Sequence, residues 1–288
     1  MTGTPHVVWD AAAELGEGPV WVGDALWFVD IKKRRIHRFT PATGEQRVWD
    51  APEQVGFLFP ARSGGFVAGL QSGLYRFDPD GGGFELIARV DAHVPGNRLN
   101  DGTVDPQGRL WFGTMDDGER DKNGAFYCFA DGEVRETGIR GIAITNGPAV
   151  SPDGRMLYWV DTLKGTMSVA EIHADGSLGS SRLLVKVDPA DGHPDGPAVD
   201  SNGDIWLSLY AGWEVRRYSP AGELLESVPF PVANITKLAF GGSDLRTAYA
   251  TTARQLLTPE AIAGQPAAGH LFAFEVDAPG LPTPLVAC

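Results

Sequence analysis

Residues 195–200 read Asp-Gly-Pro-Ala-Val-Asp, and residues 205–209 read Ile-Trp-Leu-Ser-Leu. Three other stretches, 17–30, 100–114 and 146–161, repeat this order: an oxygen-bearing side chain, a strand-like run, a short turn and an aromatic strand. Weaker copies begin at Gly56 and Thr236, so the six starts are 39, 44, 46, 49 and 41 residues apart. A period of roughly 40–50 residues with several short strands is typical of a β-propeller.

Each unit has the pattern of a small antiparallel sheet. The first run ends at a turn such as Asp-Pro-Gln-Gly at 105–108, where Pro presets one backbone angle and Gly tolerates a positive φ. We therefore expect an all-β six-bladed β-propeller with four-stranded antiparallel blades around a central channel. No linker divides the chain, so residues 1–288 are expected to form a single domain. Ring closure requires a joint between the last blade and the first, and we expect residues 6–10 to pair with 269–276.

The bulk composition limits the classes of partner. Asp and Glu number 37 against 24 Lys and Arg, which gives a formal net charge of −13. This field repels nucleic acid and anionic membranes and favours neutral or cationic small ligands. Cys128 and Cys288 form no metal-binding spacing, and the sequence has neither a secretory signal nor an apolar run that could span a membrane. We expect a cytoplasmic monomer.

The repeat also predicts a site. The innermost strand of every propeller blade lines the channel, so Glu17, Asn100, Asn146 and Asp195 should meet near the axis. Carboxylates gathered there need a cation to compensate their charge. Four independent turns are the alternative, because Asp or Asn before Gly is a common turn pair, but Glu is a poor turn former.

Oxygen donors of this kind suit several divalent metals. Three or four protein ligands leave positions open for water and substrate, which favours a catalytic Fe²⁺, Mn²⁺ or Zn²⁺, with Ca²⁺ as the alternative because it usually takes six to eight ligands. The longer loop at 116–124 is expected to be a solvated loop; the alternative is that it overhangs the channel mouth as a lid, with Glu119 as a candidate substrate contact.

Three motifs resemble the gluconolactonase, regucalcin and senescence-marker-protein family of six-bladed propellers. They are Leu-Gly-Glu-Gly-Pro at 15–19, Arg-Leu-Asn-Asp-Gly at 98–102 and the run from Asp105 to Met115, beside the repeats at 146 and 195. The resemblance covers residues 5 to 276 and is strongest to bacterial sugar lactonases such as xylonolactonase. Pro148 and Pro197 depart from the family pattern, which often has Leu or Met there, and should stiffen the strand entry.

The resemblance implies roles for individual residues. Glu17, Asn146 and Asp195 would bind one divalent metal, and Arg98, Asn100 and Asp101 would contact the substrate. The implied reaction is hydrolysis of a sugar (aldono) lactone, xylonolactone or a related pentono- or hexonolactone, to the aldonic acid in pentose or other carbohydrate degradation. Either Asp195 or Asp101 would take the proton from the attacking water. The alternatives are a propeller hydrolase for phosphotriesters or aryl esters, a non-enzymatic ligand-binding propeller and a calcium-binding protein.

Overall fold

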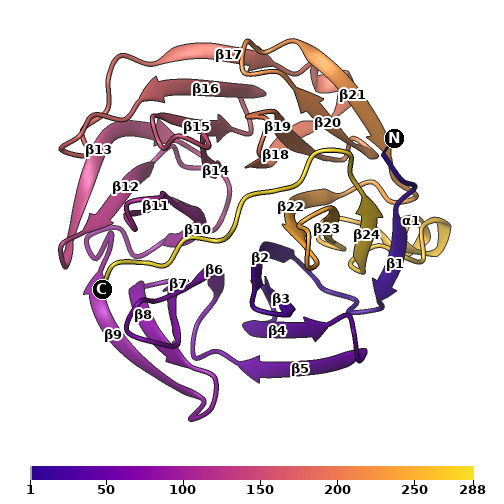
Figure 1. Ribbon diagram of the computed structural model, residues 1–288, viewed down its shortest axis with the longest axis horizontal. Coiled ribbons are helices and arrows are strands. Elements are labelled where there is room, and N and C mark those ends of the chain that lie inside the picture. Colours follow the sequence, from indigo (N-terminus) through magenta and orange to yellow (C-terminus); the bar gives the residue numbers. More distant parts are fainter. Residues whose placement is uncertain (1) are drawn as a thin grey trace.

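Six four-stranded antiparallel sheets form a ring around a central axis in the computed structural model, which describes residues 2–288 (Figure 1). Blade 1 holds β2 (Gly16–Val22), β3 (Ala25–Asp30), β4 (Arg35–Thr40) and β5 (Glu45–Asp50); blade 2 holds β6 (Val55–Pro60), β7 (Phe66–Leu70), β8 (Gly73–Asp78) and β9 (Gly83–Arg89). Blade 3 holds β10 (Asn97–Val104), β11 (Leu110–Asp116), β12 (Gly124–Ala130) and β13 (Glu133–Ile142); blade 4 holds β14 (Thr145–Val150), β15 (Met156–Asp161), β16 (Thr166–Glu171) and β17 (Arg182–Lys186). Blade 5 holds β18 (His193–Val199), β19 (Ile205–Tyr210), β20 (Glu214–Tyr218) and β21 (Leu224–Pro229); blade 6 holds β22 (Ile235–Gly241), β23 (Thr247–Thr252), β24 (Leu271–Glu275) and β1 (His6–Trp9). The predicted six-bladed propeller is confirmed.

The N-terminal strand closes the ring. β1 pairs antiparallel with β24, placing His6 opposite Ala273 and Val7 opposite Phe272, as expected from the sequence. Blade 6 therefore combines three strands from the end of the chain with one from its start, which ties the last blade to the first (Figure 1).

The first strand of every blade has a β-bulge at the repeat position. The pairing register shifts between Glu17 and Val20 in β2, and corresponding shifts occur in β6, β10, β14, β18 and β22. A bulge inserts an unpaired residue and re-aims the neighbouring side chains. The Gly that follows Glu17 has φ of 52°, and the one that follows Asn146 has φ of 74°, which is backbone that favours glycine. The oxygen-bearing residues are thus directed toward the channel.

Aromatic side chains on the second strands fill the space between blades. Trp111 and Trp206 are almost completely buried, and their indole N–H groups donate to the buried carboxylates of Asp105 and Asp200 at 2.9 and 3.0 Å. The same Asp accepts the backbone N–H groups of its own turn, so the turn and the interblade core are locked together. This core holds the channel strands in place.

The C-terminal segment crosses the face of the ring opposite the cavity described below. After β24 the chain runs over the channel mouth, and Val286 exchanges backbone hydrogen bonds with Pro60 and Arg62 of blade 2 (Figure 1). Helical structure in residues 2–288 is limited to a 3-10 turn, η1 (Pro189–Asp191), and α1 (Pro259–Gly264), and none of it is long and apolar enough to cross a membrane.

Candidate active site

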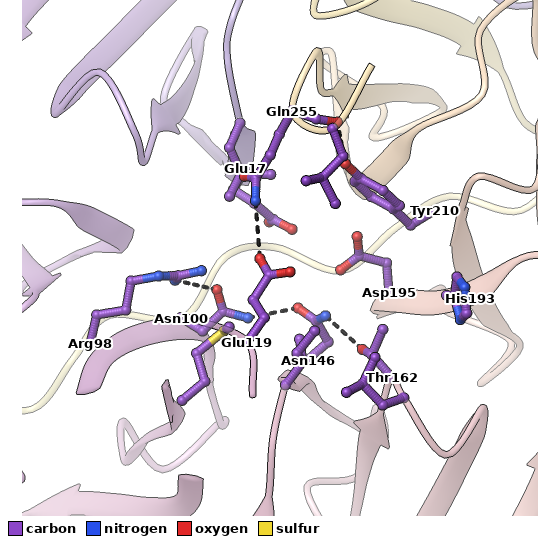
Figure 2. Close-up of a pocket in the computed structure, with 15 residues that line it drawn as sticks. Glu17, Arg98, Asn100, Glu119, Asn146, Thr162, His193, Asp195, Tyr210 and Gln255 are labelled. Atoms are coloured by element: carbon purple, nitrogen blue, oxygen red, sulfur yellow. Dashed lines mark hydrogen bonds between the residues drawn. The ribbon is translucent and has the colours of Figure 1, made fainter. Parts of the chain in front are cut away.

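The four oxygen-bearing residues of the repeat lie around one cavity. Glu17, Asn100, Asn146 and Asp195 come from four blades and line a space of about 180 Å³ at one mouth of the channel (Figure 2). The same cavity is also lined by Leu15, Arg98, Met115, Glu119, Ile144, Thr162, Leu163, His193, Tyr210, Gln255 and Leu256. The structure therefore brings the four repeat residues together although Glu17 and Asp195 are 178 positions apart in the chain.

Two carboxylates in this cavity share an environment that disfavours their charge. Glu17 and Asp195 are 3% and 6% exposed. Burial, followed by the nearby Asp101 carboxylate, raises the pKa of Glu17 to about 8. Burial, followed by the charges of Glu17 and Asp101, raises the pKa of Asp195 well above its usual range. A bound divalent cation would favour the charged form of both carboxylates and so lower their pKa values.

The Asn146 carboxamide is oriented by a hydrogen-bond chain. The Thr162 hydroxyl donates to the backbone oxygen of Pro194 at 2.9 Å, so its own oxygen must accept, and Asn146 Nδ2 donates to it at 2.9 Å. This leaves Asn146 Oδ1 on the side of Asn100, whose Nδ2 donates to it at 3.0 Å. Oδ1 keeps a second lone pair for a ligand in the cavity.

The donor set of Glu17, Asn146 and Asp195 fits a divalent cation. Two carboxylates and one correctly turned amide oxygen are hard donors of the kind that Mn²⁺, Mg²⁺, Ca²⁺ and Fe²⁺ accept. Across residues 2–288 no group of three or more His, Cys, Asp or Glu side chains is arranged to hold a metal, so the site depends on the carboxamide. The sequence pattern counted Asn among the candidate ligands, and the assignment of these three residues to a metal stays a prediction.

Arg98 and Asn100 form a rigid wall of the cavity. Arg98 Nη1 donates to Asn100 Oδ1, and Arg98 Nε donates to Asp117 Oδ1 at 2.8 Å. Asn100 Nδ2 also donates to the backbone oxygen of Thr145 at 2.6 Å. Both side chains are thereby fixed in orientation, and both reach the cavity as predicted for substrate contacts.

Asp101 does not join this group. Its side chain is completely buried and is not part of the cavity lining. One carboxylate oxygen accepts from Lys237 Nζ at 2.6 Å and from the Gly102 N–H at 2.7 Å, and the other accepts from the Gly147 N–H at 2.9 Å. Asn100 and Asp101 lie within the bulge between Leu99 and Gly102, and only Asn100 reaches the cavity, while Asp101 reaches Lys237. This placement corrects the expectation that Asp101 touches substrate or attacking water.

Several lining residues were missed by the repeat pattern because they lie outside the repeat positions. Gln255 follows β23, and its Nε2 donates to Glu119 Oε1 at 3.0 Å across the cavity mouth (Figure 2). Tyr210 donates to the backbone oxygen of Gln255 at 2.6 Å and supports this bridge. The 116–124 loop therefore reaches the cavity through Glu119, which corresponds to the alternative and not to the solvated loop that the sequence favoured.

Comparison with known proteins places the chain in a family. The model of the SMP-30/Gluconolactonase/LRE-like region matches residues 15–254. The chain belongs to this family. The 6-deoxy-6-sulfogluconolactonase of Pseudomonas putida is 37% identical over 277 residues, covering 95% of each chain, and the regucalcin of Oryctolagus cuniculus is 32% identical over 269 residues, covering 89% of each. A solved structure described as a calcium-binding protein, regucalcin, from Agrobacterium tumefaciens superposes with a TM-score of 0.95 at 29% identity, covering 99% of this chain and 98% of the other.

Replacement of Thr162 by Val in this family member tests the orientation of Asn146. Val has the shape of Thr but cannot accept from Asn146 Nδ2, so the carboxamide loses the contact that keeps its oxygen toward the cavity. Removing such an orienting contact typically lowers metal affinity about 10–100-fold, and we expect this loss in a calorimetric titration with Mn²⁺. Affinity equal to that of the unmodified chain would show that Asn146 needs no support from Thr162.

The raised pKa values predict how the metal-free protein responds to pH. Because Glu17 titrates near 8 when folded and near 4.5 when unfolded, the unfolded chain releases its proton first as pH rises, and stability falls across this window. Asp195 acts in the same direction. A Glu17→Gln, Asp195→Asn double variant lacks both groups and should exceed the metal-free parent in Tm by a margin that grows from pH 5 to pH 8. Thermal unfolding of the two proteins measures it, and a margin that is constant or shrinks with pH would contradict the shifts.

Proposed function

We propose that this chain hydrolyses the ester bond of a sugar lactone to the aldonic acid with the aid of one divalent metal ion. The reaction class follows from the family and from the lactonase relative, which agree with the predicted enzyme type. The observation that carries the metal-dependent proposal is the convergence of Glu17, Asn146 and Asp195 on one small cavity, beside Arg98 and Asn100.

The metal would be held by Glu17, Asn146 and Asp195, and when bound it would supply a Lewis acid for the lactone carbonyl. Asp195 faces the cavity, and among residues 2–288 no side chain donates a hydrogen bond to its carboxylate. It is therefore the better placed of the two Asp residues to accept the proton of the attacking water. The acyl carbon–oxygen bond of the ring then breaks, and the ring oxygen leaves as a hydroxyl after receiving the proton that Asp195 took from the water.

Arg98 and Asn100 would orient the substrate. The bonds of Arg98 to Asp117 and Asn100 leave the guanidinium immobile, so it binds a lactone hydroxyl or ring oxygen without losing further side-chain entropy. Glu119 and Gln255 at the mouth would enclose the bound lactone, and opening of their hydrogen bond would admit it.

A small neutral lactone suits this cavity better than a bulky ester does. The space of about 180 Å³ is lined by three carboxylates, Glu17, Glu119 and Asp195, while the Arg98 cation is already paired. We propose a five- or six-carbon aldonolactone, with xylonolactone as the first to examine. Mn²⁺, Fe²⁺ and Zn²⁺ are the preferred ions, and the description of the Agrobacterium relative as calcium-binding supports Ca²⁺ as the alternative.

A substrate panel tests the proposal. Purified protein supplied with each metal is incubated with pentono- and hexonolactones, an aryl ester and a phosphotriester, and acid release is followed in a pH-stat. Metal-dependent release of acid from at least one aldonolactone, faster than from the aryl ester or phosphotriester, is expected. Turnover of the phosphotriester or aryl ester alone would move the chain to the alternative hydrolase class, and no turnover at all would favour a binding protein.

A further inference from the structure

A second layer of residues lies directly behind the candidate ligands. Four residues that each follow a repeat position form it through mutual contacts, namely Asp101, Gly147, Gly196 and Lys237. Asp101 and Lys237 are the charged members, and they come from β10 and β22, which lie in opposite blades 3 and 6 (Figure 1). Lys237 lines a separate cavity at the opposite mouth, so this layer divides the channel.

The two charged residues meet across the axis. Lys237 Nζ lies 2.6 Å from Asp101 Oδ1 and donates to the backbone oxygen of Gly102 at 3.0 Å. Lys237 is 7% exposed and Asp101 is completely buried. A Cβ at Gly196 would lie 2.7–2.8 Å from three carbons of the Lys237 side chain, so blade 5 has room for this lysine because the residue is glycine.

The ion pair touches the backbone next to two candidate metal ligands. Asp101 Oδ2 accepts from the N–H of Gly147, which follows Asn146. Lys237 packs against Gly196, which follows Asp195. The pair is thus built into the strands that carry the site and does not lie on a surface.

The charges of the pair reach the cavity carboxylates. Asp101 is hydrogen-bonded to the residue after Asn146, and Lys237 is packed against the residue after Asp195, so both charges lie beside the backbone that carries the candidate ligands. At such range a cation in the cavity would be attracted by Asp101 and repelled by Lys237. While both charges are present their effects on the cation largely cancel.

Resting on the metal-dependent function proposed above, we propose that Asp101 and Lys237 are positioning residues whose opposed charges set the affinity of the cavity for its cation. Loss of the Asp101 charge leaves a buried, unpaired ammonium group behind the strands that carry the site, which weakens cation binding. Loss of the Lys237 charge removes a repulsion and therefore strengthens cation binding. A contact that served packing alone would weaken binding whichever partner was removed.

The test compares two variants that both lack the ion pair and differ in the Lys237 charge. Metal-free wild type, Asp101→Asn and the double variant Asp101→Asn, Lys237→Met are titrated with MnCl₂ by calorimetry. Asp101→Asn should bind Mn²⁺ at least about tenfold more weakly than wild type, and adding Lys237→Met should restore affinity by at least about tenfold. Lys33→Met, which removes an exposed lysine, is the matched control and should leave the affinity of Asp101→Asn unchanged.

Binding by the double variant that is no tighter than binding by Asp101→Asn would overturn the proposal. If Asp101→Asn does not fold, Lys237→Gln replaces it, because its amide still donates to Asp101 while the positive charge is lost. This variant should then bind Mn²⁺ more tightly than wild type, and weaker binding overturns the proposal. Absence of Mn²⁺ binding by the wild type would contradict the metal site and the proposed function as well, whereas the other adverse results contradict the charge effect alone.

Discussion

Asp195→Asn is expected to lower kcat/KM for the lactone by at least about 10³-fold, because one substitution removes a negative metal ligand and the proposed proton acceptor together. The change is nearly isosteric, and Asp195 has no side-chain donor among residues 2–288 to lose. The fold should therefore be retained, and the buried negative charge that destabilises the metal-free protein is removed. Steady-state kinetics at several metal concentrations measures the effect.

An exposed carboxylate provides the control for this substitution. Asp80 lies in the turn between β8 and β9, and Asp80→Asn should retain the wild-type kcat/KM. Activity of Asp195→Asn within about tenfold of wild type at saturating metal would remove Asp195 from the proton-transfer role, since such transfer typically contributes 10²–10⁴-fold.

Removal of the metal is the second change with a large expected effect. Treatment with a chelator followed by dialysis should reduce lactone turnover by at least about 10³-fold, since both Lewis-acid activation and water positioning are lost. Readdition of Mn²⁺, Fe²⁺ or Zn²⁺ should restore turnover and raise Tm, because a ligand that binds only the folded state stabilises it. Initial rates and thermal unfolding report the two effects on one sample.

The order in which metals restore activity identifies the ion. Recovery with Ca²⁺ alone would identify Ca²⁺ as the bound ion. This result would agree with the description of the Agrobacterium relative as a calcium-binding protein. Full activity after exhaustive chelation would contradict metal-dependent hydrolysis and leave Asp195 acting without a metal.

The blade architecture was predictable because the same sequence pattern occurs six times along the chain. The register of Glu17, Asn146 and Asp195 could be read directly, since equivalent positions of a closed ring must meet at the axis. The joint between β1 and β24 was predictable for a similar reason, because an open ring would leave unpaired strand edges.

The direction of adjacent side chains was not predictable from the pattern. Asn100 and Asp101 are neighbours in one motif, and the bulge in β10 sends the first to the cavity and the second to Lys237. Neighbouring residues of a strand point to opposite faces, but a bulge interrupts that alternation, so the repeat position alone did not assign Asp101 to the ion pair.

Residues outside the repeat positions were beyond the reach of sequence reasoning. Thr162 follows β15 and Gln255 follows β23, in connections whose lengths differ from blade to blade. Lys237 occupies a repeat unit that was recognised only weakly, and its partner Asp101 lies 136 positions away. Such residues come into contact only when the ring closes, so no local sequence pattern indicates the pair.

The most direct test of the metal site is anomalous diffraction from crystals of the protein grown with Mn²⁺. One strong anomalous peak is expected in the cavity, about 2.0–2.3 Å from oxygens of Glu17, Asn146 and Asp195, with the remaining positions filled by water. A peak bound by other residues, or a cavity without a peak while calorimetry detects Mn²⁺ binding, would contradict the assignment of these three ligands.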